Sequence, residues 1–143
     1  IYKENCGFYA STVSRIDQRI LNEFIKDGYF ERYLNKMRKV YRERHDFLLS
    51  KLTFFEKEFT ISGENAGLHI LLSSKSCIPE RELLEAALKH GIKVYGISDA
   101  CMGREGNTNA LFKSTVLLGY GALDKQELEM GIELLKKAWS LYL

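Results

Sequence analysis

The sequence is short of the features that mark several classes of protein. Its three cysteines, Cys6, Cys77 and Cys101, form no Cys-x-x-Cys pair, which argues against a zinc or redox centre and favours reduced thiols. No apolar run approaches the roughly eighteen residues of a transmembrane helix. No charged-then-apolar signal segment opens the chain. We therefore expect a cytoplasmic protein without a membrane partner.

Neither sign of charge is in marked excess. The chain has 21 Lys and Arg against 19 Asp and Glu, and its formal net charge of +2 is too small to imply a nucleic-acid partner. The basic residues are densest in ERYLNKMRKVYRERHDF (residues 31–47), where a nucleic-acid-binding helix is one interpretation. These residues surround the predicted helix and are interleaved with acidic ones, so a solvated helix surface is the better explanation.

Recognisable catalytic motifs are also missing. His45, His69 and His90 are too scattered for a metal site, and no Ser-His-Asp arrangement or nucleophile elbow occurs. The loop GREGN (103–107) lacks the Lys-Ser/Thr ending of a P-loop, so a flexible loop is preferred to a phosphate cradle. Arg104 and Lys113 remain candidates for a ligand carboxylate, because both cations lie near the ends of predicted strands.

The sequence does contain enough apolar surface for one core. Its 143 residues are 45% hydrophobic and include eight Tyr, eight Phe and one Trp, which argues against disorder and predicts a single domain. Apolar residues at helical spacing follow Ser14, an expected N-cap, as far as Gly28, and a second, longer helical stripe continues to Leu52. We interpret residues 14–52 as a long helical connector.

Residues 53–143 have the pattern of a compact α/β sandwich. Two strands, 54–62 and 68–74, are joined by the turn SGENAG and are expected to pair antiparallel. They are followed by a helix that begins at Pro79 and ends before Gly91, a strand (92–97), a long irregular segment (98–114), a strand (115–123) and a final helix capped by Asp124 and Glu127. The predicted fold class is α/β (α+β), a two-layer sandwich in which helices cover a mostly antiparallel sheet.

The strand in SGENAGLHILLSS (62–74) begins unusually, because Gly67 and His69 stand where its apolar run starts. A glycine there allows a ligand or another backbone segment to come close, so we interpret this strand as approaching a small-molecule site. His69 is either a hydrogen-bonded core histidine, the preferred interpretation, or a catalytic group. His90 is explained as a cation at a helix C-terminus.

Four segments, in order, resemble one family. They are FYASTVSRIDQRILNEFIKDGYFERYLNKMRKVYRERHDFLLSKL (8–52), NAGLHILL (65–72), GIKVYGIS (91–98) and VLLGYGALDKQELEMGIELLKKAW (116–139). These segments are similar to the C-terminal part of MocR-type regulators, GntR-superfamily transcription factors that fuse a winged helix-turn-helix to a fold-type I aminotransferase-like domain. Free-standing aminotransferases of the 2-aminoadipate type resemble them less closely. Because the chain opens on Ile1 without a capping signal, we expect residues 1–143 to be one C-terminal subdomain of a longer protein.

The resemblance implies a fold that binds pyridoxal 5'-phosphate (PLP) mainly in a large domain upstream. The resemblance implies that the Schiff-base lysine lies in a Ser-x-Ser-Lys-like motif before Ile1. No such motif occurs here, so we assign no catalytic residue and do not expect this fragment to be an enzyme or to bind PLP covalently. FYASTVS implies cofactor-binding positions at Tyr9, Ser11 and Thr12, near the neighbouring subunit's cofactor in a homodimer. AGLH implies that Gly67 and His69 face the substrate.

One position departs from the family pattern. Related aminotransferases hold the substrate α-carboxylate with an arginine in the strand that here reads VLLGYG, where Leu117 takes its place. Lys113 or Arg104 could substitute, although lysine is a point charge that does not reproduce the arginine fork. The substrate-binding candidates are therefore Lys113, Arg104, Gly67 and His69. The departure disfavours efficient transamination more than ligand sensing.

The resemblance thus predicts a subdomain that closes over an amino acid or amine and passes that motion to a DNA-binding domain outside this chain. DNA would be bound only through that N-terminal domain, and no metal is expected. Two alternatives remain open. One is the small domain of a true PLP-dependent aminotransferase, and the other is a stand-alone α/β small-ligand or interaction module.

Overall fold

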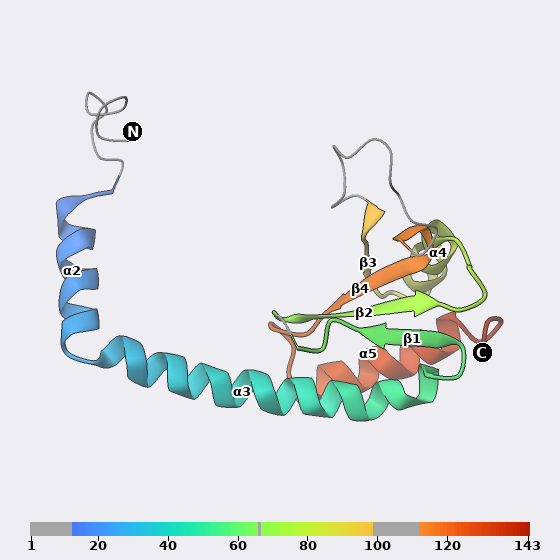
Figure 1. Ribbon diagram of the computed structural model, residues 1–143, viewed down its shortest axis with the longest axis horizontal. Helices are drawn as coiled ribbons and strands as arrows, with labels where there is room; N and C mark the ends of the chain where they lie inside the picture. The colour runs from blue at the N-terminus through green and yellow to red at the C-terminus, as the bar shows by residue number, and fades with distance from the viewer. Residues whose placement is uncertain (1–12, 66, 99–111) are drawn as a thin grey trace, which may run out of the picture. The chain divides into compact units, whose positions relative to one another are not determined.

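The structure is a computed structural model that describes residues 13–65, 67–98 and 112–143 (Figure 1). The chain divides into two compact units, residues 1–39 and 40–143, and each is described by itself. Within the described residues, no helix is both long enough and apolar enough to cross a membrane.

The first unit holds α2 (Arg15–Lys26) and the beginning of α3 (Tyr29–Leu52). As predicted, Ser14 caps α2: its Oγ accepts a hydrogen bond from the Asp17 amide at 3.1 Å. Gly28 separates the two helices, and its φ of +74° lies in the left-handed region that a side chain disfavours. The apolar residues of α2 are exposed, so this helix buries none of its side chains within the described chain.

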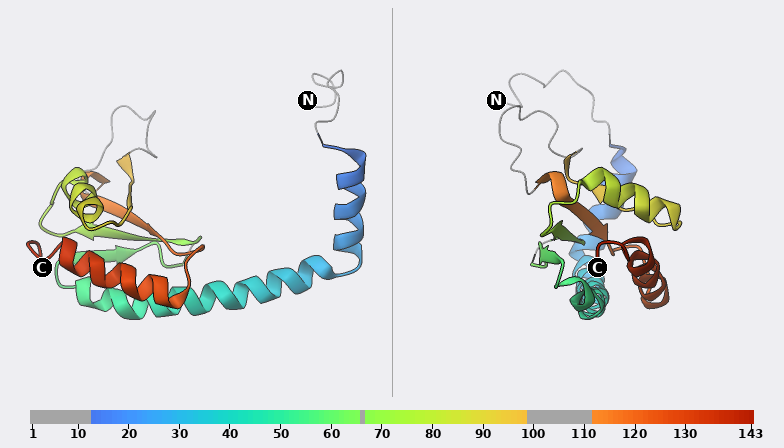
Figure 2. Two further views of the ribbon diagram at one scale, coloured as in Figure 1. Left: turned by 180° about the vertical axis from the view of Figure 1, so that it is seen from behind. Right: turned by 90° about the vertical axis from the view of Figure 1, so that its right-hand side faces the viewer.

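The second unit is built on an antiparallel sheet with the strand order β1-β2-β4-β3 (Figure 1). Its strands are β1 (Phe59–Ser62), β2 (His69–Ser74), β3 (Tyr95–Gly96) and β4 (Thr115–Gly119). β1 and β2 form the predicted antiparallel pair, with Ile61 opposite Leu72. The helices α4 (Glu80–Lys89) and α5 (Lys125–Ala138) pack with the end of α3 on the sheet, as Figure 2 shows from two further sides.

The core lies between the helices and one face of the sheet. Buried aliphatic residues alternate along the two central strands and point toward the helices: Ile70, Leu72, Val116 and Leu118. The helices meet them with Leu48, Leu52, Leu83, Leu128, Ile132 and Leu135. Trp139, just after α5, is fully buried, stacks on Phe59 with 5.2 Å between ring centroids, and donates its indole N–H to the Leu83 carbonyl at 3.1 Å. This arrangement confirms the predicted two-layer α+β class.

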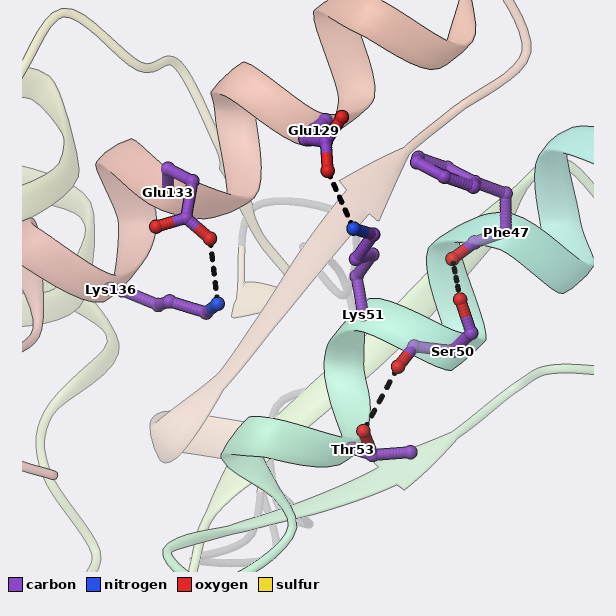
Figure 3. Close-up of polar contacts among 7 residues, drawn as sticks. All are labelled: Phe47, Ser50, Lys51, Thr53, Glu129, Glu133 and Lys136. Carbon is purple, nitrogen blue, oxygen red and sulfur yellow. Dashed lines mark hydrogen bonds and ion pairs between the residues drawn. The ribbon is translucent and has the colours of Figure 1, made fainter.

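Polar contacts at the rim of the core join the end of α3 to α5 (Figure 3). Lys51 Nζ lies 2.6 Å from Glu129 Oε1 and links the two helices. The Ser50 hydroxyl donates to the Phe47 carbonyl and the Thr53 hydroxyl to the Ser50 carbonyl, which occupies two acceptors near the end of α3. Because both charged side chains are partly exposed, this ion pair contributes at most about 1 kcal/mol, and apolar burial holds the helices together.

The first predicted strand, 54–62, is shorter than expected. Residues Thr53–Phe55 form a 3-10 helix directly after α3, and the strand begins only at Phe59. The reason is the burial of Phe55, which is fully inside the core and packs edge-on against Phe59 and Trp139, at 6.1 and 5.8 Å between ring centroids. The chain must turn at this point to place the ring there.

The third predicted strand, 92–97, also pairs over only part of its length, Tyr95–Gly96. The Ile92 amide donates to the Ala87 carbonyl at 3.0 Å in the turn that closes α4. The Ile97 amide donates instead to the carboxylate of Glu80 at 2.8 Å. Both ends of the segment are therefore tied to α4 and not to the sheet.

Candidate functional site

Gly67 lies in the turn before β2, and a Cβ there would meet, among the described residues, only His69 Nδ1 at 3.9 Å, so no close approach requires the glycine. Gly67 has a φ of +75°, which favours a residue without a side chain. Tyr120 closes over this turn: its hydroxyl donates to the Gly67 carbonyl at 3.0 Å and its amide to the Leu68 carbonyl at 3.1 Å. A Cβ at Gly121 would stand 2.8 Å from Leu68 Cδ1, so a larger residue there would require the Leu68 side chain to move. In the described chain, the segment that approaches Gly67 is the turn after β4.

His69 lies outside the core, and its interpretation as a core histidine is wrong. It is exposed and is paired with Gly119 across the β2–β4 ladder. The alternation along β2 explains the error, because Ile70 and Leu72 point to the helices and His69 and Leu71 therefore point to the opposite face. His69 is free of the packing constraints that the core would impose.

Leu117 occupies the middle of the sheet face opposite the helices. The ladder places it between Leu71 of β2 and Tyr95 of β3, with Ser62 beyond Leu71. Leu71 and Leu117 are half-buried, and Tyr95 is 54% exposed. This row offers apolar contact to a ligand, but no fixed charge.

The predicted substrate-binding residues do not form a single cluster. Lys113 is exposed in the 3-10 helix Phe112–Ser114 that precedes β4, whereas Gly67 and His69 lie beside the other end of that strand. Four steps along β4, at about 3.3 Å each, separate these two ends by about 13 Å. Four further candidates lie outside the described residues: Arg104, Tyr9, Ser11 and Thr12.

A polar network connects α3 to the Gly67 turn. His45 Nε2 lies 2.8 Å from the Glu64 carbonyl oxygen, and His45 Nδ1 lies 3.0 Å from Asp46 Oδ1. The His45 ring is also 5.8 Å from the ring of Tyr120, which is only 4% exposed. Burial raises the pKa of the Tyr120 phenol, and the negative charge of Asp46 adds to that shift. This network connects α3 to the turn between β1 and β2 and to Tyr120 after β4.

Glu80 is a buried carboxylate that the sequence did not single out for this role. An acidic residue in the first turn of α4 is favourable, but Glu80 is only 7% exposed. It accepts hydrogen bonds from the Ile97 amide at 2.8 Å, from the Ser98 amide at 3.1 Å and from the Ser98 hydroxyl. A Cβ at Gly96 would lie 2.0 Å from Glu80 Oε1, so the glycine makes room for the carboxylate. Glu80 therefore fixes the path by which the chain leaves β3.

A largely apolar cleft opens on the helix side of the sheet, beneath the end of β4. Its empty volume, including the part open to solvent, is about 430 Å³. Residues 92–94 form one wall, Leu118 and Gly119 form another, and α5 forms the floor. Lys93 and Glu127 are the charged side chains among its lining residues. The described residues contain no group of His, Cys, Asp and Glu that could hold a metal ion.

Comparison with known proteins identifies the sequence relatives. No protein-family model matches the chain. The uncharacterized HTH-type transcriptional regulator YhdI of Bacillus subtilis is 34% identical over 139 residues, which are 96% of this chain and 28% of that protein. The probable rhizopine catabolism regulatory protein MocR of Rhizobium meliloti is 26% identical over 136 residues, or 94% of this chain and 26% of its own length. The resemblance to the C-terminal part of MocR-type regulators is confirmed. The chain spans little more than a quarter of these relatives.

The fold is shared with solved aminotransferases. The crystal structure of LysN, the alpha-aminoadipate aminotransferase of Thermus thermophilus complexed with N-(5'-phosphopyridoxyl)-L-leucine, matches with a TM-score of 0.70. The match covers 87% of this chain and 31% of LysN at 22% sequence identity. The helix-covered sheet described above is therefore the fold of an aminotransferase C-terminal subdomain.

Proposed function

We propose that the chain is the small subdomain of a PLP-binding, aminotransferase-like effector domain in a MocR/GntR-type regulator, where it closes over an amino acid or amine. The observation that carries this proposal is the match to regulators along 94–96% of the chain, combined with an aminotransferase fold. A large PLP-binding domain and a DNA-binding domain would make up the rest of the parent protein, a homodimer. Closure would reach the DNA-binding domain as a population shift.

Lys75 is the described lysine that most resembles the lysine of a Ser-Lys motif, and its contacts do not suit the covalent attachment of PLP. Lys75 follows two serines, but its ammonium donates to the carbonyls of Glu56 at 2.6 Å and Lys57 at 3.2 Å. It is thus occupied by backbone at the β1 edge of the sheet. When bound to the parent, PLP would supply an electrophilic aldehyde for the amine of the ligand. This chain would contribute one wall of the ligand site.

The sheet face opposite the helices is the surface best suited to be that wall. It carries the apolar row around Leu117, with Gly67 and His69 at one end of β4 and Lys113 at the other. A ligand against Leu117 would gain apolar contact there, and its carboxylate would need a cation from elsewhere. Lys113 and Arg104 remain the candidates for that cation.

Reductive labelling tests the assignment of the cofactor. The 143-residue chain is incubated with PLP, reduced with borohydride, and mapped by mass spectrometry. We expect labelling to be substoichiometric and spread over exposed lysines, because none is held as a specific Schiff base. A Lys75→Arg variant serves as the matched control and should leave total labelling almost unchanged. One lysine labelled stoichiometrically would contradict the proposal.

A true PLP-dependent aminotransferase without a DNA-binding domain is the second candidate, and the likeness to LysN favours it. The coding sequence upstream of Ile1 separates the two. A winged-helix pattern there supports the regulator, and a large domain without one supports the enzyme. A start codon directly before Ile1 contradicts both and supports a stand-alone module.

A further inference from the structure

The cleft beneath the end of β4 is suited to a ligand in its own right, independently of the proposed function. We propose that it binds a small monocarboxylate with an aliphatic or aromatic tail, with the tail in the cleft and the carboxylate at Lys93. The cleft lies on the helix side of the sheet, whereas the row around Leu117 faces the other side. The cleft is therefore a second site, and Lys93 lies where the two meet, because it lines the cleft and its ammonium contacts the ring of Tyr95.

The cleft exists because residues 92–94 stand apart from β4. The Ile92 amide is bound to the Ala87 carbonyl, and pairing with β4 begins only at Tyr95. Leu118 and Gly119 are paired with β2 on one side, but no described residue pairs with them on the other. The gap that results reaches inward to the core residues Leu48, Leu128, Ile132 and Leu135.

Gly131 keeps the floor of this cleft open. It lies inside α5, where glycine lowers helix stability relative to alanine. A glycine inside a helix commonly permits close packing, but a Cβ at Gly131 would meet no heavy atom within 4 Å. Close packing therefore does not explain the glycine, and the space beside it is available to a ligand.

The charges at the mouth of the cleft select an anion. Glu127 is committed to the capping box of α5, where its Oε2 accepts from the Asp124 amide at 2.8 Å. Lys93 is exposed, and its described contact is with the ring of Tyr95, 5.1 Å from Nζ to the ring centroid. Its ammonium can therefore receive an anion, and as a point charge it accepts a carboxylate in many orientations.

The size and lining of the cleft define the rest of the ligand. The empty space of about 430 Å³ includes the part that is open to solvent, so the cleft encloses only part of a ligand. Apart from Lys93 and Glu127, the lining side chains are Leu, Ile and Val together with glycine. Such a lining offers no partner to a second polar group, so the tail must be apolar.

A titration of the 143-residue chain with octanoate, and with 1-octanol as its neutral counterpart, tests the proposal. Binding is measured by calorimetry and by the amide NMR signals of Gly119 and Gly131. Lys93→Met removes the charge and keeps the length of the side chain, with Lys89→Met as the control at an exposed cation outside the cleft. Gly131→Leu fills the cleft with a good helix former, Gly131→Ala fills it in part, and Met130→Leu is the control on the exposed side of α5.

The proposal predicts saturable binding of octanoate with one site per chain. Lys93→Met should weaken octanoate binding roughly fivefold and leave octanol binding unchanged, because one exposed ion pair is lost. Gly131→Leu should weaken binding of both probes by about tenfold or more without lowering the melting temperature, and the controls should have no effect. The proposal is overturned if octanoate does not saturate, if Lys93→Met leaves its affinity unchanged, or if both Gly131 variants bind like the parent sequence.

Discussion

At the residue scale, the fold relies on a few buried polar groups whose partners are distant along the chain. Glu80 is a buried carboxylate with no ion pair to another described residue, and two amides and a hydroxyl compensate for its lost hydration. Tyr120 is buried in the same way and bonds to Gly67. Each of these groups connects two elements, so its removal should affect the whole second unit.

The contact of Glu80 with Gly96 predicts that two small substitutions are costly. Gly96→Ala forces a Cβ against the carboxylate and should lower the free energy of unfolding by about 1–3 kcal/mol. Glu80→Gln places an NH₂ group next to the backbone amides and the hydroxyl that now donate to the carboxylate, and it should lower the free energy of unfolding by about 1–3 kcal/mol. Urea unfolding measures both, with the exposed Glu82→Gln as the matched control from the same turn of α4.

The double variant Gly96→Ala with Glu80→Ala shows whether the clash is the cause. Because alanine removes the carboxylate that the new Cβ would meet, Gly96→Ala should cost clearly less in the Glu80→Ala background than alone. Equal costs in the two backgrounds would contradict this account of Gly96.

Tyr120 predicts a defined dependence of stability on pH. Burial raises the pKa of its phenol above the unfolded value near 10, so the stabilisation is complete below about pH 10 and is lost as the pH rises through the folded value. Tyr120→Phe lacks the bond to Gly67 and should be about 1 kcal/mol less stable at pH 8. Its deficit against the parent sequence should shrink toward pH 11.

Urea unfolding between pH 8 and 11 measures this difference. The exposed Tyr95→Phe is the control and should show no such trend. A deficit of Tyr120→Phe that stays constant over this range would show that the phenol titrates alike in the folded and unfolded chains.

At the scale of elements, local chemistry determined where the helices begin, and distant contacts determined where the strands end. Ser14 and Asp124 cap α2 and α5 as the sequence predicted, because a cap and its partner amide lie within one turn. β1 begins later than predicted because Phe55 packs into the core. β3 ends earlier than predicted because the Ile97 amide donates to Glu80 in α4 and not to the sheet. The same difference between local and distant contacts explains why the turn at Gly67 could be predicted from the sequence while the role of Glu80 could not.

α2 is predicted to be the least protected helix of the described chain. It has 12 residues, none of them buried, and helices of this length are marginal in water without packing. Hydrogen exchange of the 143-residue chain should therefore be much faster for the amides of α2 than for those of α5, which buries Leu128, Ile132 and Leu135. Comparable protection of the two helices would show that α2 is covered in solution.

At the scale of the whole molecule, the fold could be predicted because the amphipathic patterns and the family resemblance indicate the same fold. Amphipathic patterns indicated helices over a mostly antiparallel sheet, and the order of four segments resembled an aminotransferase-like subdomain. The candidate site could be predicted only in part. Gly67 and His69 lie at one end of β4 and Lys113 at the other, so a ligand that used all three would have to span the face between them. The chain matches about 28% of a regulator such as YhdI, and the remaining groups of the site would come from the rest of the parent.

The central claim is tested most directly by hydrogen exchange on the intact, PLP-loaded parent protein with and without candidate amino acids. Closure over a ligand should slow exchange in the turn at Gly67 and Leu68 and in the segment that leaves β3 at Ile97 and Ser98, with α5 unchanged. A ligand that alters the PLP absorbance and leaves exchange in both segments unchanged would contradict the claim that this subdomain closes over it.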